Sequence, residues 1–458
     1  MSSDNSPKIL SSSYRATCTR PAMKSMFFLP VLLMAAAPSA SADATASKLD
    51  SLNERVTELE AAQALQTVRF SGVFINRFED FTTTYGVPGT AKDKDRLTTF
   101  STYLALNLDF DIAERLKLYT TLAMSKFWQN DGRNEYAGNW QASEGGSFGY
   151  AGSTPRIDRA YLAYTFSFPL TLAIGRMPTN NGVPVNQLDG LVREGTYPRF
   201  AYNAIFDGIA AIFDFTRYLP HGHSLKLRAF YTPNINIDNA DRTSQLTDGM
   251  VKVDSNTPQY AILAEYSTTR LAPIFDTLSL YYMFYQYSNF YNAGTNTPAT
   301  PDTAPSNPTD AAIGNMLYLG LEGIGHIGLN ASLSVLLYRD TTTTLDGCQS
   351  ATTLSKAYLL NVNQRLDFIL AGSVIGFELI KTDPTFYLDE WTYLTVIPFY
   401  SSPASQGVHV FASVPIGEKL RARVGWYRLH SDPYSYMGFS SSLESDDNSF
   451  YVQLRLGF

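Results

Sequence analysis

The last ten residues constrain the fold more than any other segment, because they alternate without a break to the final residue. One face of this segment is wholly apolar, with Phe450, Val452, Leu454, Leu456 and Phe458. The other face carries Ser449, Tyr451, Gln453, Arg455 and Gly457. Successive side chains of a β-strand point to opposite faces, and a strand with one wholly apolar face suits a wall between lipid and water. The C-terminus therefore predicts a strand of a membrane β-barrel.

The chain continues this pattern from residue 67 onward. The predicted strands are 67–80, 97–112, 116–128, 156–168, 170–177, 206–216, 224–233, 258–268, 276–289, 312–325, 328–339, 354–367, 369–381, 407–415, 419–430 and 448–458. Short connections alternate with long polar ones, which are 81–96, 129–155, 178–205, 234–257, 290–311, 340–353, 382–406 and 431–447. Outer-membrane barrels have short periplasmic turns and long external loops. We therefore expect an all-β fold, a 16-stranded antiparallel transmembrane β-barrel over residues 67–458, with both of its ends on the periplasmic side.

An export signal precedes the predicted barrel. Lys24 is followed by an apolar core at 26–37 and by the small residues Ala40-Ser41-Ala42. A charged start, a short apolar core and a small-residue cleavage site make up a secretory signal peptide. We expect residues 23–42 to be that signal and the polar residues 1–22 to be an upstream extension.

Charge and cysteine content exclude two further classes of protein. The chain has a net charge of −7. Residues 1–42 contain four basic residues and one acidic residue, so removing them takes the net charge to −10. An acidic exported protein is a poor nucleic-acid binder. Because Cys18 lies in the removed segment, Cys348 remains alone and a disulfide within the mature chain is excluded.

Residues 43–66 are predicted to form a short periplasmic coiled-coil helix. Leu49, Leu52, Val56 and Leu59 follow the 3-4-3 spacing of a coiled-coil seam. The seam covers fewer than about three heptads, which is too short to hold a trimer by itself. Two interpretations remain: an amphipathic helix that lies on the barrel mouth, or a trimerisation segment.

The third long connection, 178–205, is the best functional candidate, because it is unusually apolar for an exposed loop. Val183, Leu188 and Phe200 favour burial against another surface. The loop could fold into the lumen and narrow the pore, or it could pack over the outer mouth or against a neighbouring subunit. If it folds inward, the predicted constriction residues are Asp189, Arg193, Glu194 and Arg199.

Strand parity predicts charged side chains on the inner face. A basic wall is expected where the last two strands meet the first, from Arg69, Arg421, Arg423 and Arg455. Other predicted pore-lining residues are Lys117, Arg159, Glu265, Glu322 and Glu378. A basic wall that faces an acidic loop would orient dipolar solutes and exclude apolar ones. Alternatively, the arginines form ion pairs and hydrogen bonds within the wall.

Acidic clusters lie in three of the long connections. They could bridge divalent cations to lipopolysaccharide, or they could be solvated loop tips; they are Asp93-Lys94-Asp95, Asn234–Asp241 and Glu444-Ser445-Asp446-Asp447. The sequence offers no metal-ligand set, no cofactor motif and no local catalytic constellation. Residues 323–328 match G-x-G-x-x-G, but an alternating strand follows them where a dinucleotide site needs a helix. We interpret this stretch as a glycine-rich turn and expect no enzyme activity.

The chain resembles the general bacterial porins over residues 67–458, through its topology, loop pattern and terminal Phe458. More closely, it resembles a porin-like proteobacterial family. The stretch Arg156-Ile-Asp-Arg-Ala-Tyr-Leu-Ala-Tyr and the stretch Gly175-Arg-Met-Pro carry this similarity. The resemblance implies a homotrimeric channel in the outer membrane of a Gram-negative bacterium, for passive diffusion of small hydrophilic solutes or ions. It also implies contact with lipopolysaccharide, and recognition of Phe458 by the barrel-assembly machinery. The alternative is a barrel that is not a porin, either a structural or adhesive protein or the sheath of an electron-transfer conduit.

Overall fold

The fold is known from a computed structural model of the chain. It describes residues 51–57, 68–128, 155–178, 182–183, 198–200, 205–233, 259–270, 274–288, 311–340, 353–384, 404–436 and 439–458. The chain divides into two compact units, Met1–Ala62 and Gln63–Phe458. The first contains a helix at residues 51–57, in which the predicted seam residues Leu52 and Val56 are exposed. Leu49 and Leu59 lie outside the described residues.

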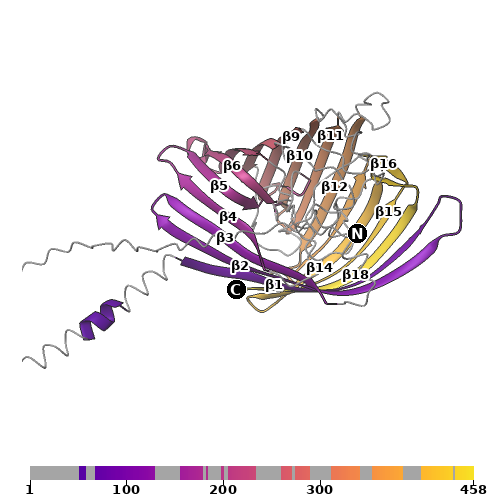
Figure 1. Ribbon diagram of the computed structural model, residues 1–458, viewed down its shortest axis with the longest axis horizontal. Coiled ribbons are helices and arrows are strands. Elements are labelled where there is room, and N and C mark those ends of the chain that lie inside the picture. Colours follow the sequence, from indigo (N-terminus) through magenta and orange to yellow (C-terminus); the bar gives the residue numbers. More distant parts are fainter. Residues whose placement is uncertain are drawn as a thin grey trace, which may run out of the picture. The chain divides into compact units, whose positions relative to one another are not determined.

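The second unit is a closed antiparallel barrel of sixteen strands, which confirms the predicted fold class. The order around the wall is β1-β18-β15-β14-β13-β12-β11-β10-β9-β8-β7-β6-β5-β4-β3-β2 (Figure 1). The strands are β1 (Val68–Gly86), β2 (Asp93–Ala113), β3 (Leu116–Phe127), β4 (Arg156–Thr165), β5 (Leu170–Pro178), β6 (Ile205–Asp214), β7 (His223–Thr232), β8 (Gln259–Thr268), β9 (Thr277–Ser288), β10 (Ala311–Ile324), β11 (Leu329–Asp340), β12 (Thr353–Arg365), β13 (Val374–Thr382), β14 (Ser405–Ile416), β15 (Leu420–Ser431) and β18 (Glu444–Gly457).

The barrel closes where β1 pairs with β18. Their register runs from Val73 opposite Gly457 to Gly86 opposite Glu444. Beyond it, Gly72 and Phe458 exchange two backbone hydrogen bonds of 2.8 and 3.1 Å. The predicted last strand therefore has its partner in the predicted first strand. We call this end of the barrel the near rim and the opposite end the far rim.

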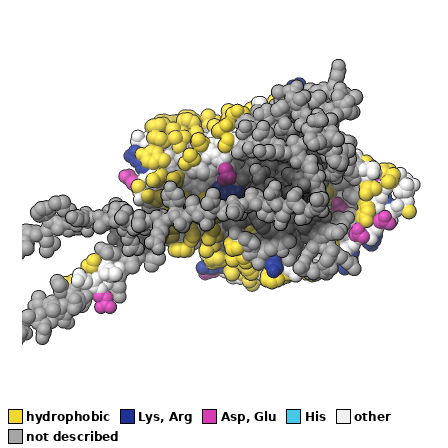
Figure 2. Space-filling view, viewed as in Figure 1, with side chains coloured by type: hydrophobic (Ala, Val, Ile, Leu, Met, Phe, Trp, Pro, Cys, Tyr) yellow, Lys and Arg dark blue, Asp and Glu magenta, His cyan; other side chains and the backbone are white. Residues whose placement is uncertain are grey.

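The outer face of the wall is apolar. Exposed side chains on it include Phe78, Phe100, Ile262, Leu317, Leu333, Phe377, Val410, Trp426, Phe450 and Leu454. Figure 2 shows hydrophobic side chains gathered over the outside of the wall. The inner face alternates with it: on β13 every second residue, from Val374 to Thr382, is buried while the residues between are exposed. This alternation is the one that the C-terminal pattern predicts.

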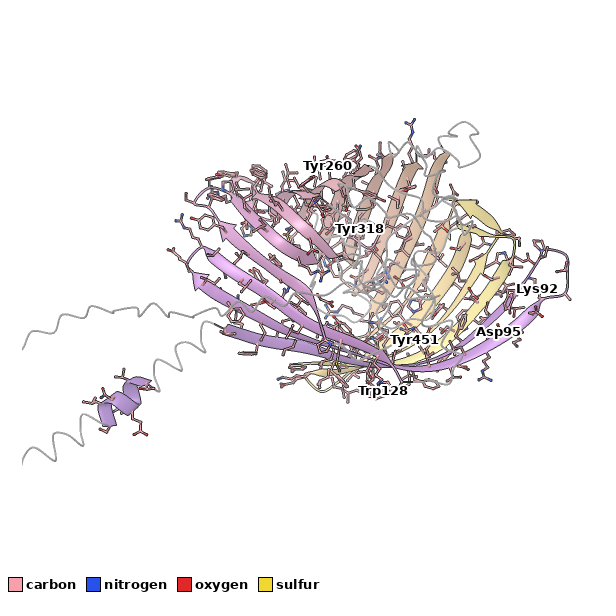
Figure 3. All side chains as sticks on the ribbon, in the orientation of Figure 1. Lys92, Asp95, Trp128, Tyr260, Tyr318 and Tyr451 are labelled. Atoms are coloured by element: carbon pink, nitrogen blue, oxygen red, sulfur yellow. The ribbon has the colours of Figure 1, made fainter. Side chains whose placement is uncertain are left out.

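The first predicted loop, 81–96, is mostly strand. β1 continues to Gly86, β2 begins at Asp93, and only 87–92 connect them. The hairpin projects past β3 at the far rim, with Lys92 and Asp95 at its end, whereas β18 pairs with β1 as far as Gly86 (Figures 1 and 3). Its outer face turns polar beyond Phe78, with Asp80 hydrogen-bonded to Arg96 at 2.7 Å. The segment was missed because a strand that rises above the apolar band needs no apolar face.

Two further boundaries differ from the prediction. β13 begins at Val374, because residues 366–373 form a turn in which the amides of Ile369 and Leu370 bond the Leu366 carbonyl. Its apolar residues had suggested a strand from 369.

The last long connection holds a separate two-stranded sheet, β16 (Tyr434–Tyr436) and β17 (Phe439–Ser441). A short 3-10 helix, η1 (Thr216–Tyr218), precedes β7. Within the described part of the chain, no helix has the length and apolarity needed to cross a membrane.

Candidate functional site in the barrel interior

A continuous network of buried polar side chains crosses the inner face of neighbouring strands. We call it the polar belt. Its members are Arg77, Glu79, Ser449, Tyr451, Tyr427, His409, Glu378, Asn361, Asn363 and Asn330. They lie on β1, β18, β15, β14, β13, β12 and β11, and none is more than 9% exposed. They sit side by side because the register brings alternate inward positions of adjacent strands together, such as Glu378 opposite both His409 and Asn361.

The belt begins with Glu79, which is fully buried on β1. Its carboxylate accepts hydrogen bonds from Arg77 Nε at 3.0 Å, from Ser449 Oγ at 2.7 Å and from the Tyr427 hydroxyl. The Arg77 guanidinium also lies 3.6 Å from the ring centroid of Tyr451. A buried charge is tolerated when it is paired and its remaining sites are hydrogen-bonded, and Glu79 meets both conditions.

His409 joins this group to the next strand. Its Nε2 lies 2.8 Å from the Tyr451 hydroxyl and its Nδ1 lies 2.8 Å from Glu378 Oε2. With a proton on Nδ1, His409 donates to the Glu378 carboxylate and accepts from Tyr451. Such an arrangement fixes both the tautomer and the orientation of the ring.

Amides complete the belt. Asn361 Nδ2 donates to Glu378 Oε1 at 3.1 Å, Asn363 Nδ2 donates to Asn361 Oδ1 at 2.8 Å, and Asn330 Nδ2 donates to Asn363 Oδ1 at 2.8 Å. The Asn330 Oδ1 then accepts from the Gly323 amide at 3.0 Å. The belt thus links β1, β18, β15, β14, β13, β12, β11 and β10 across the inner face, and its side chains are closed to solvent.

The opposite part of the inner wall carries charge pairs that solvent reaches. Arg159 lies 2.7 Å from Asp109, and Lys117 lies 3.1 Å from Asp111. On the strands that follow, Lys226 lies 3.3 Å from Asp214. Arg228 and Glu265 form a more buried pair at 3.2 Å. The predicted residues Lys117, Arg159 and Glu265 are therefore all paired within the wall.

An aromatic pair lies among these charges. The rings of Tyr119 and Tyr161 stack with centroids 4.9 Å apart, and the Arg159 guanidinium is 5.5 Å from the Tyr119 centroid. Cations favour the face of an aromatic ring. The stack and the Arg159–Asp109 pair thus give this part of the wall a fixed surface of alternating charge and aromatic rings.

Three of the four residues expected in the basic wall, Arg421, Arg423 and Arg455, lie on the paired strands β15 and β18. Arg421 is directly opposite Arg455, and Arg423 is directly opposite Gln453. Arg421 Nη1 donates to the Gly372 carbonyl at 2.9 Å. The register also puts Arg77 opposite Gln453. Gln453 thus lies between Arg423 on β15 and Arg77 on β1, so the arginine group extends onto β1.

Arg69 does not align with these residues. The residue of β1 opposite Arg455 is Ile75, six positions along the strand from Arg69. At about 3.3 Å per residue this separates the two positions by about 20 Å. Arg69 instead lies 3.6 Å from Asp111. The error arose because parity gives the face of a residue but not its height.

The third long connection is described only at its two ends. The Arg199 amide donates to the Val183 carbonyl at 3.1 Å, and Val183 and Phe200 are 3% and 0% exposed. Asp189, Arg193 and Glu194 lie outside the described residues. Glu322, another predicted lumen residue, lies at the near-rim end of β10 opposite Thr277.

The glycine-rich stretch 323–328 contains the end of β10 and the turn that leads to β11. Gly323, Gly325 and Gly328 all have positive φ, between 62° and 77°, a conformation that glycine adopts without strain. Two of the three acidic clusters are not loop tips, because Asp93 starts β2 and Glu444 starts β18. The third cluster, Asn234–Asp241, lies outside the described residues. Glu444 lies 2.8 Å from Lys92 Nζ, and Asp446 pairs with His430 and Arg428. No described group of acidic, His or Cys side chains has the makings of a metal site.

A family model described as a protein of unknown function (DUF3373) matches residues 93–321, half of the chain. The chain belongs to this family. The DUF3373 match begins with β2 and ends within β10, so it contains the solvent-reached charge pairs and the third long connection. It also contains the two stretches that carry the sequence resemblance, 156–164 and 175–178.

Solved structures similar to this DUF3373 barrel are bacterial outer-membrane proteins. OprB of Pseudomonas putida at high pH has a TM-score of 0.50 at 10% identity, over 87% of this chain and 96% of its own. OmpF of Salmonella typhi with daunomycin has a TM-score of 0.47 at 10% identity, over 85% and 97%. The anion-selective porin of Comamonas acidovorans has a TM-score of 0.46 at 11% identity, over 85% and 99%. The chain thus has the porin fold. No curated protein matches it.

Sequence reasoning missed most of the polar belt. Arg77 and Glu79 share the inward parity of Arg69, so a complete parity assignment would have found them. Tyr451 shares the parity of Arg455, and Tyr427 that of Arg421, so the same assignment would turn both rings inward. It would not reveal their hydrogen bonds to His409 and Glu79, because parity does not give strand register.

Proposed function

We propose that this protein is an outer-membrane porin that lets small hydrophilic solutes or ions diffuse passively. One observation carries the proposal: a closed wall of sixteen strands is apolar outside and bears solvent-reached charge pairs inside. A barrel of this strand number is wide enough for an aqueous channel. The inner charges favour hydrated solutes over apolar ones. The function is transport, and no catalytic step is part of it.

The same proposal assigns the two rims. The near rim, with short turns and Phe458, would face the periplasm, and the projecting β1–β2 hairpin would lie outside the cell. Residues 23–42 would direct export and be removed, and the barrel-assembly machinery would recognise Phe458. The helix near residues 51–57 would be the periplasmic coiled-coil segment of a homotrimer. The outer face would contact membrane lipid, including lipopolysaccharide.

Within this channel, we place the solute path along β2–β4 and β6–β8, where the charge pairs are open to solvent. The third long connection, 178–205, would narrow the path. The burial of Val183 and Phe200 at its two ends supports a loop that turns inward. Asp189, Arg193, Glu194 and Arg199 would then face Arg421, Arg423 and Arg455 across the pore.

A second candidate function is a barrel that conducts nothing, such as a structural protein or a sheath around a partner. The polar belt favours it, because Glu79, Glu378 and Asn361 face inward and yet are fully buried. A wall closed in this way over seven strands leaves only the remaining strands for a solute path.

Planar-bilayer recording separates the two functions. The purified, folded protein should give discrete conductance steps if it is a porin. A folded barrel that inserts into the bilayer without conductance steps would support the structural function instead.

A further inference from the structure

Three basic side chains lie together on the outer face of the wall at the far rim. They are Arg339 on β11, Lys356 on β12 and Lys381 on β13, and we call them the basic patch. Lys356 is directly opposite Leu337, two residues before Arg339, and Lys381 is directly opposite Tyr358, two residues after Lys356. Diagonal neighbours of this kind are about 7–8 Å apart on an antiparallel sheet. The register therefore makes Lys356 a neighbour of both other cations.

The patch has no ion-pair partner among the described residues. All three side chains are exposed, and no described carboxylate lies within ion-pair distance of Arg339, Lys356 or Lys381. The Asp383 carboxylate accepts a hydrogen bond from the Lys356 backbone amide at 2.9 Å, and no ion pair joins it to the three cations. Like charges this close destabilise a sheet, unless an anion from outside the chain compensates them.

The surroundings of the patch distinguish it from a solvated charge cluster. Towards the middle of the wall, the same outer face continues with exposed Leu333, Leu337, Phe377 and Leu379, and Tyr358 lies between the basic residues. The cations thus stand at the edge of the apolar band, next to an aromatic residue of the type that favours the membrane interface. Long basic side chains at such a height reach towards lipid headgroups.

Neighbouring strands lack this charge. The corresponding outward residues at the far rim of β7, β8, β9 and β10 are Tyr231, Tyr260, Gln286 and Ile313. Among the other outward cations of the described far rim, Arg96 pairs with Asp80 and Arg428 pairs with Asp446. Lys94 on β2 and Lys126 on β3 have no ion pair among the described residues, but they are not neighbours, because Lys126 is opposite Thr102, and Lys126 lies 4.9 Å from the Trp128 ring centroid. Within the described far rim, a group of three adjacent unpaired cations on the outer face is therefore found on β11–β13.

We propose that the basic patch binds the phosphate groups of a phosphorylated glycolipid in the outer leaflet. This inference rests on the proposed outer-membrane location, and it gives the lipid contact a defined site. Lysine and arginine are the usual ligands of phosphate, arginine through two parallel N–H donors and lysine as a point charge. The acyl chains of such a lipid would lie against Leu333, Leu337 and Leu379 directly below.

Titration of the full-length protein in non-ionic detergent with fluorescent diphosphorylated lipid A, read by anisotropy, tests the site. The variant R339Q/K356Q/K381Q should bind about 100-fold more weakly, since each basic residue near an anionic surface strengthens binding about fivefold. Dephosphorylated lipid A should bind the wild type as weakly as diphosphorylated lipid A binds the variant. Equal binding of the two lipids by the wild type would overturn the proposal.

The matched control removes the same charge at the other end of the barrel. Arg115, Arg217 and Lys419 are exposed in near-rim turns, and R115Q/R217Q/K419Q should bind lipid A as the wild type does. Equal weakening of lipid A binding in both triple variants would mean that net charge alone controls the affinity, and it would contradict a specific binding site. Displacement of the lipid by submillimolar inorganic phosphate would show an anion site that needs no lipid. Channel recordings on the same variants separate this proposal from the proposed porin function. A variant that loses its preference for the phosphorylated lipid but keeps the wild-type conductance is altered only at the basic patch.

Discussion

Glu378 on β13 and His409 on β14 form a buried hydrogen-bonded pair, with Glu378 Oε2 2.8 Å from His409 Nδ1 and neither side chain more than 6% exposed. The same carboxylate accepts from Asn361. Glu378 therefore connects the aromatic part of the polar belt to its amide part, and its loss leaves two buried donors without an acceptor.

Glu378→Ala should accordingly destabilise the barrel. Each buried donor left unsatisfied costs about 1–3 kcal/mol. The temperature at which the folded form disappears on an unheated gel should fall for Glu378→Ala, and fall less for Glu378→Gln, which keeps an acceptor. The control is Glu418→Ala, in an exposed turn. Equal stability of the Glu378→Ala and Glu418→Ala variants would mean that the belt contributes nothing.

Barrel closure should depend on Gly72. A Cβ there would lie 2.4 Å from Phe458 Cζ and 2.7 Å from the Ala105 carbonyl, so Gly72→Ala must displace the terminal ring or the neighbouring strand. Overpacking of this kind costs about 1–3 kcal/mol. The yield of folded, membrane-inserted protein should therefore fall. Gly457→Ala is the matched control, because the nearest atom to its Cβ is 4.0 Å away. Similar yields from both variants would contradict a tight seat for Phe458.

Acidity should strengthen the projecting part of the β1–β18 pair. Asp447 lies beyond Phe450, where the apolar band of β18 ends, and burial raises the pKa of its carboxyl to about 6, with neighbouring Asp446 adding to the rise and a Thr83 hydrogen bond opposing it. The folded segment thus binds more protons than the unfolded one between about pH 4 and pH 6, so its free energy of unfolding falls as pH rises through this window.

Hydrogen exchange of residues 79–86 and 444–449, corrected for the intrinsic pH dependence, measures this effect. Protection should decrease from pH 4 to pH 6.5 in the wild type, and Asp447→Asn should remove most of the change. The pKa of Asp446 is lowered, because hydrogen bonds from Arg428, His430 and Lys92 outweigh its burial. Its contribution has the opposite sign and is lost only in stronger acid. A wild type whose protection rises from pH 4 to pH 6.5 would contradict the Asp447 prediction.

Ion selectivity should respond to the arginines of β15 and β18. Arg423→Glu with Arg455→Glu reverses two charges on the inner face, and it spares Arg421, which holds the 366–373 turn through Gly372. Under a KCl gradient, the reversal potential should move towards cation selectivity, with at least about a twofold change in the permeability ratio. Arg115→Glu with Lys419→Glu, in exposed near-rim turns, should change it less. An unmoved reversal potential in the Arg423/Arg455 variant would make these arginines structural.

Much of the fold could be predicted because a membrane barrel repeats one rule, an apolar outer face with polar residues between. That rule located all sixteen barrel strands, including the last, from Phe450 to Phe458. It failed at 81–96, where the outer face is polar, and at 369–373, where Ile369 and Leu370 are apolar in a turn. It gave the face of each charged residue, but pairings such as Arg159 with Asp109, or the height of Arg69, follow from strand register.

The porin function is tested by single-channel recording of the full-length protein in a planar bilayer. The wild type should give discrete conductance steps in KCl. Deletion of residues 185–196, which keeps the Val183–Arg199 hydrogen bond at the base of the loop, should make the steps larger. Unchanged steps after the deletion would place the loop away from the pore. A folded, inserted wild-type barrel that gives no steps would contradict the porin function itself.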